Sequence, residues 1–175
     1  QAPLGGGVQL QVELLQPEVD AAALGECLFR DVLSTYSTQV GGSAVRQGNV
    51  ALSAQAVNGT VLQSGEVFDF DAVVGERTET AGYGPAPSYL EGELGETVGG
   101  GVCQTAGTLY AAALYADLYI VSRSAHTYAV DYLPPGLDAA VSWGGPAFRF
   151  ENTTGYPLQI QAWVSEGELT VQLVG

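Results

Sequence analysis

The stretch Gly99-Gly100-Gly101-Val102-Cys103-Gln104 and its continuation from residue 105 to 116, T-A-G-T-L-Y-A-A-A-L-Y-A, decide the fold of this chain. Alanine and other apolar residues dominate the continuation, and no residue from 102 to 116 is charged. Because a helix that is apolar on every face must be buried, we predict a helix at the centre of the protein. Cys103 would lie at the N-terminal end of this helix, directly after three glycines.

The segments around the central helix read mainly as short strands separated by turns. Several runs alternate apolar and polar residues, which is typical of half-buried strands. Residues 71–101 are expected to be mostly loop. The predicted helices are 17–24 and a second one from its cap Ser43 to about Val57, ended by Asn58-Gly59, and the predicted strands are 8–14, 28–39, 61–70 (broken at Ser64-Gly65), 88–90, 118–122, 127–132, 138–143, 148–151, 158–164 and 169–173.

This order of elements predicts an α+β fold. A mostly antiparallel sheet would pack on two main helices, of which the central one carries Cys103 at its N-terminus. The chain has 175 residues and shows no internal repeat or linker, so we expect a single domain over residues 1-175.

The charge balance excludes several classes of function. The net charge is -14, from 19 acidic and 5 basic residues, so nucleic acid and anionic membrane surfaces would be repelled. No apolar run approaches the roughly 20 residues that span a bilayer, and we expect no membrane insertion by this segment. No signal peptide is visible. The chain opens at Gln1 rather than at a methionine, which is compatible with a leader or anchor that has been removed.

Cysteine and histidine are scarce in this chain. Cys27 and Cys103 are the two cysteines, His126 is the one histidine, and neither C-x-x-C nor H-x-x-x-H occurs. We therefore expect no metal site and no cofactor. Cys27 has no base nearby in the sequence and is interpreted as structural. Two free thiols and one Cys27–Cys103 disulfide both remain open, and the disulfide would block any chemistry at Cys103.

Cys103 is the strongest candidate for a reactive group. The positive end of a helix dipole and the free N–H groups of the first turn both favour thiolate over thiol, and the thiolate is the nucleophile. Gly100 and Gly101 would let a substrate backbone approach closely, and the N–H groups there could bind a developing oxyanion. Gln104, the next residue of the motif, is expected to line the same substrate site.

His126 and Asp138 complete a candidate catalytic set with Cys103. His126 would accept the thiol proton and later donate it to the leaving group, and Asp138, on the following strand, would orient the ring. Asp131 is the competing acid, but its odd offset from His126 along one strand would point it to the other face, which favours Asp138. A structural interpretation stays open for all three: a small buried cysteine, a structural histidine and an aspartate that caps its turn.

The arginines are rare cations in an acidic chain. One of them could hold a substrate carboxylate. We favour Arg77 and Arg123 for this role over Arg30, Arg46 and Arg149. Trp143 and Trp163 are interpreted as core or rim aromatics.

Several segments resemble the VanW domains of bacterial envelope proteins. They follow one another in the order of that family and cover about residues 34–164, with departures at Ser64, at residues 105–107 and at Ser122. The matching stretches are 58–62 (N-G-T-V-L), 64–68 (S-G-E-V-F), 74–78 (V-G-E-R-T), 82–83 (G-Y), 99–104 (G-G-G-V-C-Q), 108–112 (T-L-Y-A-A), His126, 132–139 (Y-L-P-P-G-L-D-A) and 148–154 (F-R-F-E-N-T-T).

This resemblance implies a function in the cell wall. Some VanW members are understood to be L,D-transpeptidases, which form 3-3 cross-links in peptidoglycan through the cysteine of this motif. By resemblance, Cys103 would attack the amide between the third residue and D-Ala of a tetrapeptide stem, release D-Ala, and pass the acyl group to the side-chain amine of a second stem. The resemblance also implies an extracytoplasmic location in the bacterial envelope, secreted or anchored through a segment outside these residues, and a link to glycopeptide-resistance clusters.

Two alternatives to the transpeptidase follow from the same residues. A cysteine hydrolase would use water instead of an amine to resolve the acyl-enzyme and so would trim stem peptides. A non-catalytic wall-binding or scaffold module would use the glycines and the helix only for packing, and its Cys103 would be unreactive.

Overall fold

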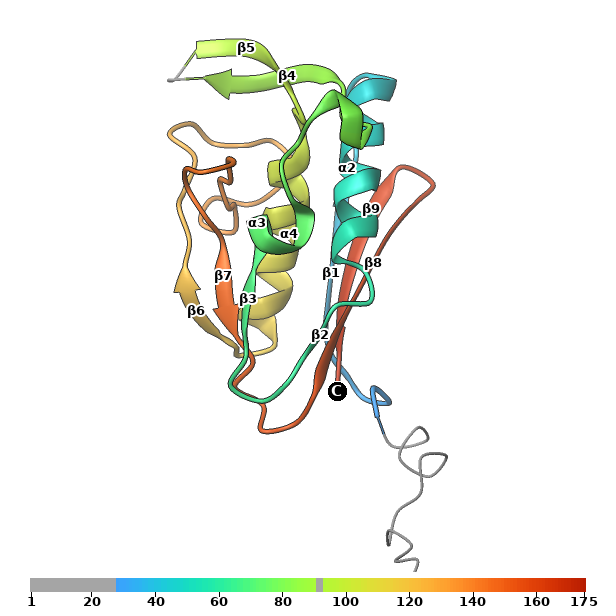
Figure 1. Cartoon of the computed structure of the whole chain (residues 1–175), viewed down its shortest axis with the longest axis vertical. Helices are drawn as coiled ribbons and strands as arrows, with labels where there is room; N and C mark the ends of the chain where they lie inside the picture. The colour runs from blue at the N-terminus through green and yellow to red at the C-terminus, as the bar shows by residue number, and fades with distance from the viewer. Residues whose placement is uncertain (1–27, 91–92) are drawn as a thin grey trace, which may run out of the picture.

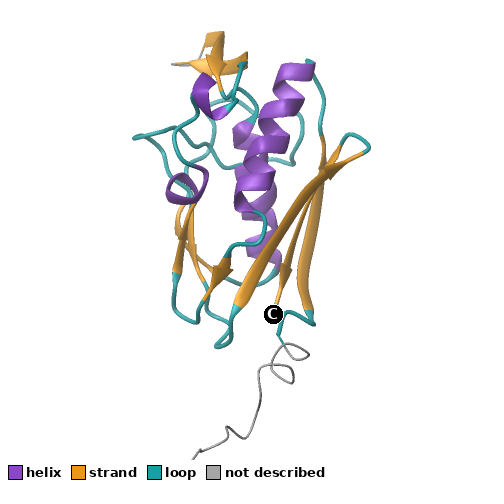
Figure 2. Ribbon diagram, turned by 45° about the vertical axis from the view of Figure 1, so that its right-hand side comes forward, coloured by secondary structure: helices purple, strands orange, loops and turns teal. Residues whose placement is uncertain are grey.

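A computed structural model describes residues 28–90 and 93–175 as helices held between two antiparallel sheets (Figures 1 and 2). The larger sheet has the strand order β1-β9-β8-β2 and the smaller one β3-β7-β6. A separate hairpin pairs β4 with β5 beyond one end of the helices (Figure 1). The strands are β1 (Val32–Gln39), β2 (Val61–Leu62), β3 (Val67–Asp69), β4 (Pro85–Leu90), β5 (Glu93–Val98), β6 (Tyr119–Ser122), β7 (Arg149–Glu151), β8 (Leu158–Ser165) and β9 (Glu168–Val174).

Within the described residues, four helical segments connect these strands. They are α2 (Ala44–Val57), α3 (Phe70–Val74), the 3-10 turn η1 (Glu79–Ala81) and α4 (Val102–Tyr115). Ser43 caps α2 by accepting a hydrogen bond from the backbone N–H of Arg46, as expected for a serine at that position. In the described part of the chain, no helix has both the length and the apolar character needed to cross a membrane.

Helix α4 lies between the two sheets (Figure 2). Ten of its 14 residues are buried, including three polar ones that hydrogen-bond to neighbouring elements. Thr108 shares a hydroxyl hydrogen bond with Thr38 of β1 at 2.9 Å, and Thr105 shares one with Ser53 of α2 at 2.7 Å. These bonds satisfy the buried hydroxyls, which would otherwise cost about 1–3 kcal/mol each, and they fix α4 against β1 and α2.

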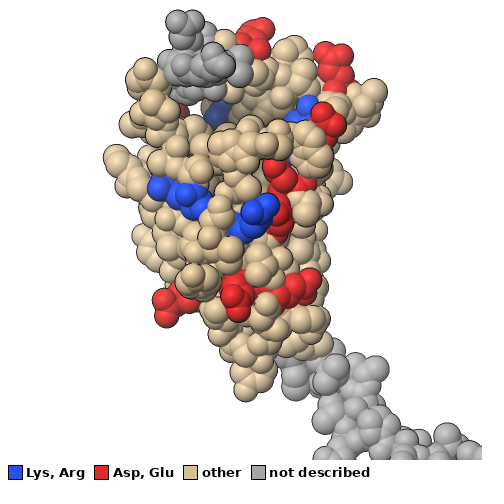
Figure 3. Space-filling model, turned by 60° about the vertical axis from the view of Figure 1, so that its left-hand side comes forward, with Lys and Arg blue, Asp and Glu red and all other residues tan. Residues whose placement is uncertain are grey.

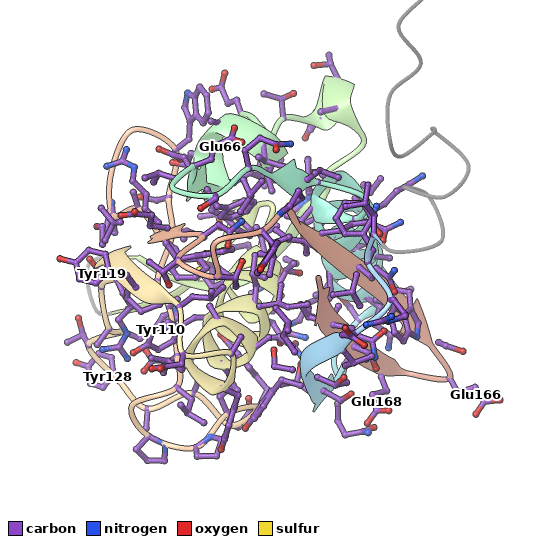
Figure 4. All side chains as sticks on the ribbon, turned by 90° about the horizontal axis from the view of Figure 1, so that it is seen from below. Glu66, Tyr110, Tyr119, Tyr128, Glu166 and Glu168 are labelled. Atoms are coloured by element: carbon purple, nitrogen blue, oxygen red, sulfur yellow. The ribbon has the colours of Figure 1, made fainter. Side chains whose placement is uncertain are left out.

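The smaller sheet packs on α4 through aromatic side chains. Phe68 of β3 stacks on Phe150 of β7, with ring centroids 5.0 Å apart, and Phe148 lies edge-on to Tyr110 of α4 at 5.7 Å. Figure 4 shows Tyr110 pointing from α4 toward the side where Tyr119 and Tyr128 lie, away from the β8–β9 turn. These rings bury large apolar surfaces, so they attach the smaller sheet firmly to the helix.

The α+β class predicted from the sequence is confirmed, but several individual strands are not. The runs 127–132 and 138–143 were predicted as strands, and both lie in a loop that spans residues 123–148. The backbone there forms loop contacts instead of a ladder: the N–H of Ala140 donates to the carbonyl of Ser124 at 2.8 Å, and that of Ser142 donates to Pro146 at 3.0 Å. Neither run has the alternating burial of a strand, because residues 127–129 are all exposed and residues 138 and 139 are both buried.

Two further predictions differ from the structure. Residues 71–101 are not mostly loop, since they hold most of α3, then η1, β4 and β5. The strands predicted over 148–151, 158–164 and 169–173 do form, but the first belongs to the smaller sheet and the other two to the larger one. The strand predicted at 8–14 and the helix at 17–24 lie outside the described residues, as does Cys27.

Candidate active site

The three glycines before α4 each have a local structural reason. Gly99 and Gly101 adopt left-handed backbone conformations with φ of 85° and 107°, which glycine tolerates and other residues rarely do. A Cβ on Gly100 would lie 2.3 Å from the carbonyl oxygen of Ala86 in β4. The glycines therefore let the β4–β5 hairpin pack directly on the N-terminal end of α4, and both Gly100 and Gly101 line the cleft described below.

Helix α2 fixes the same glycine turn from the other side. The Asn49 side chain donates to the carbonyls of Gly84 and Gly100, each at 2.9 Å, and accepts the N–H of Gly84 at 2.9 Å. Asn49 is buried, so these bonds are shielded from water. They hold the base of the hairpin and the start of α4 in one rigid unit.

Cys103 is the second residue of α4 and has a free, partly buried thiol. Its Sγ contacts the backbone of Val141 twice, donating to the carbonyl at 3.4 Å and accepting the N–H at 3.5 Å. The backbone N–H of Cys103 has no acceptor among the described residues. This N–H lies in the first turn of a 14-residue helix, where the helix dipole favours negative charge.

His126 lies between Cys103 and Asp138. Its Nδ1 is 2.8 Å from Oδ2 of Asp138, and its backbone N–H donates to the same oxygen at 2.7 Å. A hydrogen bond with the Cys103 thiol is the main cause that raises the pKa of His126; burial acts in the opposite direction, and Asp138 adds to the increase. Because Asp138 occupies Nδ1, the other ring nitrogen, Nε2, is the one left for a contact with the thiol.

Arg123 holds the carboxylate of Asp138 in place. Its guanidinium donates to Oδ1 of Asp138 at 2.7 Å and to the carbonyl of the same residue at 2.6 Å. Burial alone would raise the pKa of Asp138, but the two hydrogen bonds from His126 and the charge of Arg123 outweigh it and lower the pKa. Asp138 therefore stays ionised beside the imidazole ring.

The structure places Asp138 beside His126 by a different route from the predicted pairing of strands. Both residues lie in the loop 123–148. A Cβ on Gly107, one helical turn after Cys103, would lie 2.5 Å from Leu133 Cδ1 and 3.5 Å from the Cα of Asp138. Gly107 thus lets the loop approach the face of α4 that carries Cys103. Asp131, the competing acid, is exposed.

A cleft of about 670 Å³ opens at the N-terminal end of α4. Cys103 and His126 both line it, and four segments form its walls. They are the end of β5 with the glycine turn (97–102), residues 87–88 within β4, and the loop segments 129–132 and 140–143. Trp143, which is 53% exposed, lies on the rim. The volume is in the range of small-molecule and peptide sites.

Of the three other residues predicted to bind substrate, Arg77 lines the cleft, and Arg123 and Gln104 do not. Arg77 reaches the cleft but is engaged in a buried ion pair with Asp71 at 2.6 Å. Arg123 holds Asp138 and does not line the cleft. The Gln104 side chain is fully buried, donates to Thr38 at 3.0 Å, and is also absent from the cleft wall.

The site also contains Arg46, which ranked below Arg77 and Arg123 in the prediction from the sequence, and two residues that were not predicted, Tyr132 and Val141. Arg46 and Tyr132 line the cleft, with the Arg46 guanidinium 5.7 Å from the centre of the Tyr132 ring. Val141 contributes its backbone to the Cys103 thiol. Tyr132 had a signal in its place directly before the Leu-Pro-Pro turn, whereas a backbone contact such as that of Val141 leaves none.

No group of three histidine, cysteine, aspartate or glutamate side chains converges as a metal site in residues 28–90 and 93–175. The site brings together a thiol (Cys103), a base (His126) and an acid (Asp138). A thiol at a helix N-terminus, hydrogen-bonded to an imidazole that a carboxylate orients, is the arrangement needed for a cysteine nucleophile.

Comparison with known proteins identifies the family of this chain. The family profile described as "VanW like protein" matches residues 45–174. The chain belongs to the VanW family. The match begins after the start of the region recognised from the sequence, at about residue 34, and continues beyond residue 164 through β9.

Two curated VanW relatives align with most of this chain. One is named "Uncharacterized protein YoaR" from Bacillus subtilis (strain 168), 43% identical over 91% of this chain and 52% of its own length. The other is "Vancomycin B-type resistance protein VanW" from Enterococcus faecalis (strain ATCC 700802 / V583), 28% identical over 79% of this chain and 53% of its own. The chain therefore spans about half the length of the curated relatives it matches. No solved structure matches it significantly.

Proposed function

We propose that this VanW domain is a cysteine L,D-transpeptidase that forms 3-3 cross-links in peptidoglycan. The observation that supports it most is the connected set at the mouth of the cleft. Asp138 binds Nδ1 of His126 at 2.8 Å, and His126 lines the same cleft as Cys103, whose thiol is the largest cause that raises the pKa of His126. A structural cysteine has no need of a base that is itself oriented by a buried carboxylate.

In the first half-reaction, His126 accepts the thiol proton at Nε2, and Sγ of Cys103 attacks the carbonyl carbon of the third stem residue. A C–S bond forms while the carbonyl oxygen becomes an oxyanion. When this tetrahedral intermediate collapses, the C–N bond to D-Ala breaks, and His126 returns the proton to the departing amine. The products are a thioester on Cys103 and free D-Ala.

The start of α4 supplies the groups that would stabilise the oxyanion. The backbone N–H of Cys103 has no acceptor in the described structure, and the helix dipole adds positive potential at the same place. Removing one such donor in other acyl-transfer enzymes costs about 100- to 1000-fold in rate. The rigid turn held by Asn49 and Gly100 keeps this N–H in place before the substrate arrives.

In the second half-reaction, the side-chain amine of another stem attacks the thioester carbon. The new amide bond forms, the C–S bond breaks, and His126 takes the proton that the amine loses. The thiol is then regenerated. If water entered instead of the amine, the same acyl-enzyme would give a shortened monomer, which is the hydrolase alternative.

The relatives support a place in the bacterial envelope for this chemistry. One of them is named a vancomycin resistance protein, in agreement with the link to glycopeptide resistance that the resemblance implies. We propose that the domain works outside the cytoplasm, secreted or anchored through a segment outside these residues, with peptidoglycan stem peptides as its partners. An L,D-transpeptidase would use tetrapeptide stems, which lack the terminal D-Ala-D-Ala.

Whole-protein mass spectrometry after incubation with a disaccharide tetrapeptide tests the proposal. We expect the native chain to gain the mass of the whole disaccharide tetrapeptide minus D-Ala and to yield a cross-linked dimer, whereas the Cys103→Ala variant does neither. A shortened monomer without a dimer would identify a hydrolase. A native chain with a free thiol, no adduct and no product would overturn the enzyme and favour a wall-binding module.

A further inference from the structure

Arg46 differs from every other arginine in the chain. The chain has five basic residues, all of them arginine, and four of these form ion pairs with aspartates. The pairs are Arg30–Asp31, Arg77–Asp71, Arg123–Asp138 and Arg149–Asp69. Figure 3 shows how acidic side chains and a few basic ones share one face of the molecule. Within residues 28–90 and 93–175, Arg46 has no carboxylate partner, although acidic residues outnumber basic ones 19 to 5.

The unpaired guanidinium is held firmly at the cleft. It donates to the carbonyl of Gly41 and to Oε1 of Gln104, each at 2.9 Å. Its stem crosses the turn before the nucleophile, since a Cβ on Gly101 would lie 2.9 Å from Cγ of Arg46. Gln104 cannot move in response, because its amide also donates to the carbonyl of Gln39 at 2.8 Å. Arg46 is thus held against Gly101, two residues before Cys103, and its hydrogen-bond partner Gln104 is itself held in place.

The guanidinium retains hydrogen-bonding capacity toward the cleft. It has five N–H donors, and the two hydrogen bonds above leave three of them. Tyr132, whose ring faces the guanidinium at 5.7 Å, supplies no charge, because burial raises the pKa of its phenol far above neutrality. A planar cation in this state is suited to bidentate binding of a carboxylate.

We infer that Arg46 binds a carboxylate of the acyl-donor peptide and so selects the donor at this cleft. The identity of the peptide rests on the proposed function, whereas the binding of a carboxylate rests on the geometry of Arg46 alone. Two carboxylates of a tetrapeptide stem lie close to the scissile amide: that of the terminal D-Ala and, where the third residue is diaminopimelate, that on its side chain. Both groups are carboxylates, and the three peptide probes described below distinguish which of them Arg46 binds.

Binding is measured in the Cys103→Ala background, where no turnover occurs. The probes are L-Ala-γ-D-Glu-diaminopimelate-D-Ala, the same peptide amidated at its terminal carboxyl group, and the peptide with lysine at position three. We expect the free acid to bind about 10- to 100-fold more tightly than the probe that lacks the recognised carboxylate, as for hydrogen bonds to charged groups. Arg46→Gln should remove that preference, and Arg46→Lys should restore part of it.

A matched control separates the local effect from the general change in charge. Arg30→Gln removes one positive charge at a side chain that is 68% exposed and should leave the preference intact. Thermal unfolding of each variant shows whether the loss of the bond to Gln104 disturbs the fold. Arg46→Lys retains a donor, so it keeps the test valid if Arg46→Gln is unstable.

The outcomes distinguish this inference from the proposed function. Equal binding of all three peptides, no detectable binding, or an unchanged preference in both Arg46 variants would overturn the role of Arg46. If the preference depends on Arg46 but the native chain forms no acyl adduct, the carboxylate site stands and the transpeptidase fails. If the acyl adduct forms equally well in the native chain and in every Arg46 variant, the transpeptidase stands and the carboxylate site at Arg46 fails.

Discussion

The two sides of α4 are built in different ways. On one side, β1 and β9 present regular strands, and α4 is tied to β1 by side-chain bonds such as Ser34 Oγ to the Ala112 carbonyl at 2.7 Å. On the other side, next to the smaller sheet, and at the N-terminal end of α4 lies the loop 123–148, which contains neither helix nor strand. In Figure 1 this loop leaves β6, rises toward the hairpin and returns to β7.

The difference separates stability from chemistry. A paired strand satisfies its own backbone and buries every second side chain, so it contributes mainly to the core. The loop carries His126, Asp138 and Val141 to one thiol, which a straight strand could not do. Binding and catalytic groups are often found on loops held by a rigid scaffold, and here Arg123 and Gly107 are the parts that hold the loop in place.

The largest expected effect is on stability, through the core that supports both sides. Phe150→Ala removes a fully buried ring that stacks on Phe68 and should lower the free energy of unfolding by about 3–5 kcal/mol. Tyr119→Ala is the matched control, since Tyr119 lies on the neighbouring strand and is 63% exposed. Urea unfolding measures both. A loss of less than about 1 kcal/mol for Phe150→Ala would show that the smaller sheet does not depend on this cluster.

The second prediction concerns the loop, where activity should change far more than stability. Asp138→Asn removes the charge that orients His126 while keeping the shape, and we expect cross-linking to fall by about two to four orders of magnitude. Asp131→Asn alters an exposed acid at the cleft and should cost at least tenfold less. Initial rates of dimer formation decide between the two acids. Equal losses in both variants would mean that Asp138 has no special role.

Much of the regular secondary structure could be predicted from the sequence, because each element depends on signals within a few neighbouring residues. The start of α2 at Ser43, the break at Ser64-Gly65 and the strands near 158–164 and 169–173 each depend on capping, turn or alternation signals within a few residues. The order Cys103, His126, Asp138 was also recognisable, and the structure brings the three together. Their contact, however, follows from packing of a loop on Gly107 and not from the expected strand pairing.

The roles of the arginines could not be predicted, for a related reason. Whether an arginine is available to a ligand depends on which aspartate reaches it in space. Arg77 and Arg123 looked suitable by position, and both are engaged in ion pairs. Arg46 lies in a helix, where sequence gives no sign that its guanidinium reaches the cleft and lacks a carboxylate partner among the described residues.

The third prediction concerns the pKa of His126, measured by NMR. The chain has one histidine, so its ring signals do not overlap with those of another histidine. The thiol of Cys103 is the main cause that raises the pKa of His126, so a titration of the imidazole should give a higher pKa in the native chain than in Cys103→Ala. The unchanged contact with Asp138 keeps the ring in place in that variant. An equal or higher pKa in Cys103→Ala would contradict the Cys103–His126 contact.

The same shift gives a sign for the pH dependence of stability. Because the folded pKa of His126 lies above the unfolded value, its contribution is complete below the unfolded pKa and is lost as the pH rises through the folded pKa. For Asp138 the folded pKa is lowered, so its contribution is present above the unfolded pKa and is lost as the pH falls through the folded one. The unfolding free energy of the native chain should therefore be highest between these two pH windows and fall on either side of them. Urea unfolding of the native chain and of His126→Asn should show a difference in stability that is largest between the windows and shrinks in both directions, and a difference that does not change with pH would contradict both shifts.

The smallest expected effect tests whether the loop depends on a close approach to α4. Gly107→Ala adds a methyl group 2.5 Å from Leu133 Cδ1 and 3.4 Å from the backbone nitrogen of Ala139, so Leu133 and the loop must shift. Alanine favours the helix by about 1 kcal/mol over glycine, which offsets part of the steric cost. We expect a change in unfolding free energy of about 1 kcal/mol or less but a loss of activity of about tenfold, because Asp138 moves with the loop.

Gly48 provides the matched position on the other helix. It lies within α2, and a Cβ there would meet nothing within 4 Å. Gly48→Ala should therefore raise the unfolding free energy by up to about 1 kcal/mol and leave cross-linking unchanged. If Gly107→Ala behaved in the same way, the loop would have room to accept the methyl group without moving Asp138. The close packing on α4 would then not be what positions the acid, and Arg123 alone would have to hold it.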